Sequence, residues 1–119
     1  MKKIVDKIYN IGLFGCQVYL INTEGKEGLV LIDCGMDSEI IEDISQEGFN
    51  PKDIKHCILT HCHIDHIEAC HDINDSIPDI QFYAHELDAQ AIEERGQDQR
   101  TAASWYGKKY KPIKLYKKF

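Results

Sequence analysis

Thr60-His61-Cys62-His63-Ile64-Asp65-His66 is the stretch from which this chain is best interpreted, because it places three histidines and one carboxylate within six residues. Nitrogen and oxygen donors at this density suit a divalent metal ion. The run before it, His56 to Thr60, is short, apolar and partly β-branched, which is typical of a buried strand. The sequence therefore predicts a metal-binding loop that begins where a strand ends.

The spacing of the donors predicts two neighbouring metal positions. Side chains two apart in an extended segment point to the same side, so His61 and His63 can bind one ion while Cys62 faces away. Asp65 and His66 follow as the chain turns, and this adjacent pair can bind a second ion. We expect two divalent metal ions, with zinc as the expected metal and iron or manganese as alternatives. The competing interpretation is a histidine-rich surface loop that binds nothing.

Asp33 interrupts an apolar run, Leu29 to Cys34, that predicts a strand buried on both faces. A carboxylate near the end of a buried strand needs a hydrogen-bonding partner. We therefore interpret Asp33 as a residue that supports the metal loop from behind its ligands. A local turn cap is the alternative interpretation of this residue.

The run from Ile58 to His66 resembles the signature of the metallo-β-lactamase-fold hydrolases, which include glyoxalase II-type enzymes (hydroxyacylglutathione hydrolases). The run Leu29 to Gly35 resembles the family's preceding strand, and the similarity extends from about Ile4 to Tyr83. The resemblance implies an α/β fold, the N-terminal half of a metallo-β-lactamase αββα sandwich, with a mixed sheet covered by helices. Residues 1–119 would form one such domain, truncated at the C-terminus, because the family's later metal ligands have no counterpart here.

The resemblance also implies a function. We expect a metal-dependent hydrolase of a small-molecule ester or thioester, in which a hydroxide bridging two metal ions attacks the carbonyl. Asp65 would be the catalytic residue, since it would bind the second ion and orient the hydroxide. Glu68-Ala69 stands where the family usually has two glycines, which leaves the substrate open. The alternatives are a non-catalytic metal-binding or structural fragment and an iron persulfide dioxygenase-like oxidoreductase.

Composition and charge limit the binding partners and the cellular location that we expect for this chain. The formal net charge is −6, although residues 108–119 carry six lysines and no acid. The acidic remainder disfavours nucleic acid as a partner, and the lysine-rich end is interpreted as a solvated edge strand. We expect no membrane insertion and a cytoplasmic location, because no apolar run approaches about 20 residues and no signal peptide is evident. A homo-oligomer or a missing C-terminal half is the expected protein partner.

The five cysteines lack Cys-x-x-Cys spacing, so they are expected to be reduced thiols, with Cys62 packed in the core. Helices are predicted from Asp37 or Ser38 to Glu47, from Ile67 to Ile73, and from His85 to Glu94 with Leu87, Ala91 and Ile92 facing inward. His71 and His85 are not expected to bind the metal. The remaining predictions are strands at Ile4–Ile8, Ile11–Phe14, Cys16–Thr23 and Ile80–Ala84, a helical piece at 96–104, and an aromatic cluster of Trp105, Tyr106, Tyr110 and Pro112.

Overall fold

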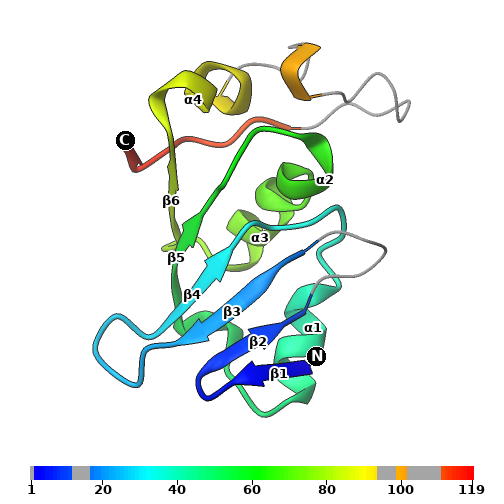
Figure 1. Cartoon of the computed structure of the whole chain (residues 1–119), viewed down its shortest axis with the longest axis vertical. Coiled ribbons are helices and arrows are strands. Elements are labelled where there is room, and N and C mark those ends of the chain that lie inside the picture. Colours follow the sequence, from blue (N-terminus) through cyan, green and yellow to red (C-terminus); the bar gives the residue numbers. More distant parts are fainter. Residues whose placement is uncertain (1, 12–16, 94–98, 102–110) are drawn as a thin grey trace.

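A mixed β-sheet forms the centre of the chain. The computed structural model describes residues 2–11, 17–93, 99–101 and 111–119. Within them the strands lie side by side in chain order (Figure 1). The first four pair antiparallel, and the fourth to the seventh pair parallel. The strands are β1 (Lys2–Val5), β2 (Ile8–Asn10), β3 (Tyr19–Asn22), β4 (Leu29–Ile32), β5 (Ile54–Ile58), β6 (Gln81–Ala84) and β7 (Lys117–Lys118).

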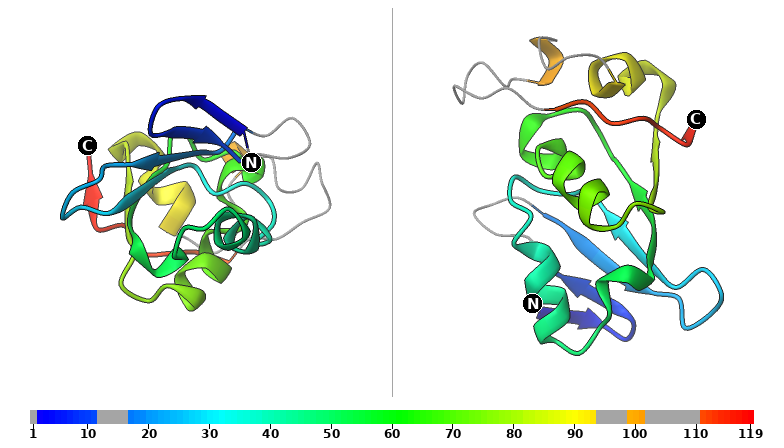
Figure 2. Two further views of the ribbon diagram at one scale, coloured as in Figure 1. Left: turned by 90° about the horizontal axis from the view of Figure 1, so that it is seen from below. Right: turned by 180° about the vertical axis from the view of Figure 1, so that it is seen from behind.

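Helices connect the parallel strands. The segment between β4 and β5 contains α1, and the segment between β5 and β6 contains α2 and α3, so two β-α-β units follow one another. These three helices lie on the same face of the sheet (Figure 2). The predicted α/β class, a mixed sheet covered by helices, is confirmed. The helices are α1 (Ile40–Gln46), η1 (Pro51–Asp53), α2 (Ile64–Ile67), α3 (Cys70–Ser76), α4 (Glu86–Glu93) and η2 (Gln99–Thr101).

The core lies between the sheet and these helices. On β4, Leu29 and Leu31 are buried, while Val30 and Ile32 are only half-buried, so this strand is not buried on both faces as predicted, because the helices between the parallel strands cover only one face. Phe82 on β6 shares the buried layer with residues from the helices. Since side chains alternate along a strand, each strand presents one face to the core and the other away from it. The half-buried residues of the second face are Tyr19, Ile21, Val30, Ile32, His56, Ile58, Gln81 and Tyr83.

Helix α1 confirms the predicted crossover between β4 and β5. Its Ile40 and Ile44 are buried, as the apolar spacing predicts. Gly48 ends the helix at a φ of +96°, where its N–H donates to Ser45 O at 3.0 Å. Glycine is favoured at this position because it adopts a positive φ without steric cost.

The N-terminal hairpin turns earlier than predicted. We expected one strand over Ile4–Ile8, but β1 ends at Val5 and the chain turns at Asp6 and Lys7, with Lys7 at a φ of +71°. The Asn22 N–H donates to Lys7 O at 2.8 Å, which fixes the turn against β3. This long-range bond explains the error, because local propensity contains no information about β3.

Two helix predictions also need correction. The helix expected over Ile67–Ile73 is divided into α2 and α3, because the Ala69 N–H donates to Gly35 O at 3.0 Å. Leu87 was expected to face the core but is 72% exposed. The buried face of α4 is instead made by Ala89, Ala91 and Ile92.

Several other predictions can be placed. The lysine-rich end does form an exposed edge strand, β7. The following lie outside the described residues: Cys16, Trp105, Tyr106, Tyr110, residues 12–14 of the strand expected at Ile11–Phe14, and most of the helical piece at 96–104. In the part of the chain that is described, no helix is long and apolar enough to cross a bilayer.

Candidate metal centre

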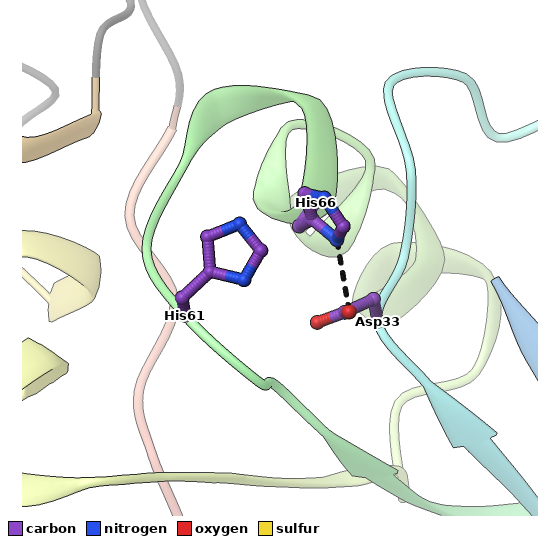
Figure 3. A group of neighbouring side chains, drawn as sticks. All are labelled: Asp33, His61 and His66. Atoms are coloured by element: carbon purple, nitrogen blue, oxygen red, sulfur yellow. Dashed lines mark hydrogen bonds and ion pairs between the residues drawn. The ribbon is translucent and has the colours of Figure 1, made fainter. Parts of the chain in front are cut away.

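The predicted metal ligands and the supporting Asp33 follow the carboxyl ends of two neighbouring strands. Asp33 comes directly after β4, and the loop that carries His61 and His63 follows β5. Because β4 and β5 pair in parallel, these two segments meet at the same edge of the sheet. Figure 3 shows His61 and His66 with their rings beside the Asp33 carboxylate.

Asp33 contacts both Thr60 and His66. Its side chain is buried, with the residue only 3% exposed. Oδ1 accepts the Thr60 backbone N–H at 2.8 Å, while Oδ2 accepts the Thr60 hydroxyl at 2.6 Å and lies 2.9 Å from His66 Nδ1. Such bonds compensate the cost of burying the carboxylate. Asp33 also has a φ of +66°, a conformation that aspartate tolerates better than most residues.

The contact with Asp33 determines which nitrogen of His66 can bind a metal. An ionised carboxylate only accepts hydrogen bonds, so His66 Nδ1 carries the proton and donates to Oδ2. Nε2 then keeps its lone pair, and it lies 3.6 Å from Asp65 Oδ2. A histidine whose other nitrogen is bonded to a carboxylate is the arrangement found at many metal sites. His66 and Asp65 can therefore offer donors to one ion.

Thr60 determines which nitrogen of His61 can bind a metal. The Thr60 hydroxyl hydrogen is directed to Asp33, so its oxygen accepts from His61 Nδ1–H at 2.9 Å. Nε2 of His61 is then the nitrogen with the free lone pair. One buried carboxylate thus sets the tautomers of two histidines, one directly and one through a hydroxyl.

The remaining donors complete the cluster. His63 Nδ1 lies 3.7 Å from Asp65 Oδ1, and His61, His63 and Asp65 each offer a ligand atom within 4.8 Å of the others. A second group of the same kind consists of Asp33, His61 and His66, and the His61 and His66 ring centroids are 4.0 Å apart. Imidazole nitrogens and carboxylate oxygens at these separations fit zinc or iron. The residues present therefore fit the predicted metal ions.

Local electrostatics favour the metal-binding form of His61. Burial lowers the pKa of His61, and the neighbouring His66 lowers it further, against the opposing effect of Asp33. A histidine must be neutral to bind a metal. The lowered pKa therefore extends to lower pH the range in which His61 is neutral and can bind a metal.

The other histidines and the cysteines lie outside this cluster, although His71, Asp72 and Asp75 form a third group of donors within 4.8 Å of one another. Cys62 is buried, and its thiol donates to the Arg100 carbonyl oxygen at 3.6 Å. His71 is half-buried beside Asp72 and Asp75 on α3, and His85 Nδ1 accepts the Leu87 N–H at the start of α4. The four cysteines in the described ranges, Cys34, Cys57, Cys62 and Cys70, are free thiols.

Sequence reasoning missed the role of Thr60. It was interpreted only as the last residue of the strand, yet its hydroxyl links Asp33 to His61. The available signal was its position directly before His61, since a hydroxyl beside a ligand histidine can accept that histidine's second N–H.

Comparison with known proteins identifies the family. The sequence profile of the metallo-β-lactamase superfamily matches residues 11–118. The chain belongs to this superfamily. The resemblance inferred from the metal loop is confirmed, and the match extends to the parallel strands β6 and β7.

Two kinds of relative support this assignment. A hydroxyacylglutathione hydrolase of Buchnera aphidicola subsp. Baizongia pistaciae is 32% identical over 83 residues. The crystal structure of BJP-1, a subclass B3 metallo-β-lactamase of Bradyrhizobium japonicum, superposes with a TM-score of 0.83 at 28% identity. The metallo-β-lactamase GOB-18 from Elizabethkingia meningoseptica gives 0.80 at 28% identity.

The chain corresponds to only part of these relatives. The match covers 70% of this chain but 30% of the Buchnera protein, and 98% of this chain but 44% of BJP-1 and 43% of GOB-18. The fold is therefore the N-terminal portion of a metallo-β-lactamase domain, as the sequence predicts.

Proposed function

We propose that this chain carries the metal-binding half-site of a metal-dependent hydrolase that acts on a thioester or ester. The observation that carries the proposal is the hydrogen-bonded network from Asp33 through Thr60 to the ligand histidines. Asp33 Oδ2 lies within hydrogen-bonding distance of both the Thr60 hydroxyl and His66 Nδ1. A loop without a metal has no need for a buried carboxylate that fixes two imidazole tautomers.

Each residue has a role that follows from its position. His61 and His63 would hold one divalent ion, and Asp65 and His66 would hold the second. Divalent ions held there supply Lewis acidity, which activates water and polarises the substrate carbonyl. His66 keeps its Nε2 turned away from Asp33 because Nδ1–H is bonded to the carboxylate. Asp65, whose Oδ1 lies 3.7 Å from His63 Nδ1 and whose Oδ2 lies 3.6 Å from His66 Nε2, would orient the attacking water.

The relatives suggest the class of substrate. The Buchnera relative is named a hydroxyacylglutathione hydrolase, which indicates a thioester of a small thiol. The structural relatives are β-lactamases, so the same site could instead serve a β-lactam amide. We favour the thioester because the Buchnera protein is related by sequence, whereas the lactamases are matched through their fold, which different activities can share.

The experiment is a hydrolysis assay on the purified chain supplied with zinc, iron or manganese in separate samples. A hydroxyacylglutathione thioester, p-nitrophenyl acetate and a chromogenic cephalosporin represent the three substrate classes. We expect slow, metal-dependent thioester hydrolysis that His61→Ala abolishes and His71→Ala leaves unchanged, because His71 lies on α3 outside the cluster.

The outcomes separate the competing functions. If only the cephalosporin were hydrolysed, the substrate would be a β-lactam and the proposed thioester would be wrong. Stoichiometric metal binding without turnover of any substrate would favour a non-catalytic metal-binding fragment. Selective retention of iron, with oxygen consumption in the presence of a persulfide, would favour the dioxygenase.

A further inference from the structure

Three buried thiols lie together behind the metal loop, and the proposed hydrolysis makes no use of them. Cys34 follows Asp33 in the turn after β4, Cys57 lies in β5, and Cys70 is the first residue of α3. The Cys70 Sγ lies 2.8 Å from the Cys34 Sγ, whereas the Cys57 Sγ lies 3.5 Å from it. Each of these residues is at most 1% exposed.

The shorter contact is already close to covalent geometry. A disulfide bond is about 2.05 Å long, so the sulfurs of Cys34 and Cys70 need to approach by less than about 1 Å. The backbone holds the two segments in register for this. The Cys34 N–H donates to His66 O at 2.9 Å, and the Ala69 N–H donates to Gly35 O at 3.0 Å. The chain on both sides of the thiol pair is therefore fixed before any bond forms.

We propose that Cys34 and Cys70 are a modification site, at which a small hydroperoxide converts the two thiols into a disulfide. The peroxide first oxidises one thiol to a sulfenic acid and leaves as water or an alcohol. The second thiol then attacks the sulfenic sulfur, the S–S bond forms, and a second water leaves. In total the two cysteines lose two electrons and two protons, and the O–O bond of the peroxide is reduced.

The surroundings decide which oxidant can act. Burial raises the pKa of Cys34, Cys57 and Cys70, so all three remain protonated at neutral pH. The thiolate is the form that a peroxide oxidises, so the raised pKa slows the reaction of all three thiols, and their burial admits only a small oxidant. Hydrogen peroxide is small enough, and we expect it to react slowly, over a long incubation.

The cross-link would affect the metal centre through the backbone. Cys34 is bonded directly to Asp33, and Cys70 lies four residues after His66. A disulfide between them closes a chain loop that contains β5 and the entire metal loop. Closing a loop of this length restricts the unfolded chain, so we expect the oxidised protein to melt at least about 5 °C higher than the reduced protein.

The test is peroxide treatment of the purified chain in the presence of a chelator, followed by acid quenching, alkylation and peptide mapping. We expect a mass loss of about 2 Da, a single Cys34–Cys70 cross-linked peptide, reversal by dithiothreitol, and the higher melting temperature. Cys57→Ser should keep the cross-link, because Cys57 makes only the longer contact. Cys70→Ser should abolish both the cross-link and the rise in melting temperature.

Three results would overturn the proposal: a disulfide that joins Cys34 to Cys57 or to Cys16, oxidation to sulfinic acid without a disulfide, or no change in the cysteines. The wild-type peptide map decides among these even if Cys70→Ser does not fold.

Discussion

Asp33 binds Thr60 at two points, since Oδ1 accepts the backbone N–H at 2.8 Å and Oδ2 accepts the side-chain hydroxyl at 2.6 Å. This pair joins the end of β4 to the end of β5. Because the hydroxyl is fixed by Asp33, it can accept from His61, and because Oδ2 also lies beside His66, both histidines depend on the same carboxylate. The position of Asp33 therefore explains why metal binding should be sensitive to a residue that need not touch the metal.

Asp33→Asn tests this dependence. Asparagine tolerates the positive φ of this position and retains one acceptor oxygen, but its amide nitrogen is a donor. With Nδ2 facing the imidazole, His66 would have to accept at Nδ1 and carry its proton on Nε2, which removes the ligand lone pair. We expect metal affinity to fall by about 10- to 100-fold while the domain stays folded. Competition with a chromogenic chelator measures the affinity, and a melting curve checks the fold.

Thr60→Val is the matched control for that experiment. It removes the hydroxyl between Asp33 and His61 but keeps the backbone N–H that Oδ1 accepts. We expect a smaller loss of affinity than in Asp33→Asn, because only one of the two histidines loses its support. Equal, unaltered affinities in both variants would show that the network has no part in metal binding.

The metal ligands themselves give the most direct prediction. The double variant His61→Ala, His63→Ala should lose most of the zinc, manganese or iron that the wild-type chain binds, because it removes both ligands of the first ion and because His61 belongs to both groups of neighbouring donors, with His63 and Asp65 and with Asp33 and His66. Elemental analysis after dialysis measures the bound metal. His85→Ala, at the exposed start of α4, should retain it. An unchanged metal content in the double variant would refute the assignment of this loop as the metal site.

Gly28→Ala should destabilise the domain without touching the metal centre. Gly28 has a φ of +67°, and a Cβ there would clash with the Asp53 carbonyl oxygen. The left-handed conformation alone costs an alanine about 1–2 kcal/mol, and the backbone clash adds to it, so we expect a loss of at least about 2 kcal/mol. Urea denaturation measures the free energy of unfolding.

Two other glycines separate the causes of this loss. At Gly48, with a φ of +96°, a Cβ would meet nothing within 4 Å, so Gly48→Ala reports the conformational cost alone. At Gly25 the nearest atom would be 3.8 Å away and the φ is not in the left-handed range, so Gly25→Ala should be nearly neutral. If Gly28→Ala proved no worse than Gly48→Ala, the clash with Asp53 would have no energetic weight.

A hydrogen-bonded chain on the second face of the sheet gives a pH-dependent prediction. His56 Nε2 lies 2.8 Å from Glu27 Oε2, and this bond holds the pKa of Glu27 below its ordinary value. A lowered carboxyl pKa stabilises the folded state above the unfolded pKa, and this contribution is lost as the pH falls through the folded pKa. In His56→Ala, NMR titration should therefore find the Glu27 pKa raised toward its ordinary value. Tyr83→Phe, which removes only the contact at His56 Nδ1, should leave it low.

The sequence predicted the parts of the fold that are set by local pattern. The strand that begins at Leu29 and the helix stop at Gly48 appear where expected, whereas β5 covers Ile54–Ile58 and not the predicted His56 to Thr60. The errors arise where a distant backbone group competes. Gly35 O takes the Ala69 N–H and divides the helix, and the bond from Asn22 to Lys7 fixes an unexpected turn. Neither partner lies within the window that a local pattern covers.

The difference between local pattern and long-range contact also explains which parts of the candidate site could be predicted. The ligand types and the support from Asp33 could be proposed because histidines and carboxylates at strand ends have few structural uses. The Thr60 link and the cysteine group could not, because each depends on the register between β4 and β5. That register places Leu31 beside Cys57 and Ile32 beside Ile58, so that Asp33 reaches Thr60.

The last prediction concerns the second face of the sheet. Helices α1, α2 and α3 cover the first face of the sheet (Figures 1 and 2). On the second face Val30, Ile32 and Ile58 are half-buried. Sheets in this class of fold pack both faces, and exposed apolar patches promote association. We expect the 119-residue chain to self-associate through this face unless a C-terminal half covers it. Light scattering coupled to size-exclusion chromatography measures the mass.

Val30→Lys should shift the chain toward the monomer, because it places a charge at the centre of this face. Leu87→Lys is the matched control, since Leu87 is 72% exposed on α4 and should not alter the mass.

The number of metal ligands limits the activity that we expect from the isolated chain. If Asp65 and His66 hold the second ion, His61 and His63 alone hold the first, whereas a catalytic zinc normally has three protein ligands. The isolated chain should therefore bind its first metal loosely and hydrolyse thioesters poorly until residues from another chain or segment complete the site. A stable monomer with fast, metal-dependent turnover would show instead that these four ligands suffice.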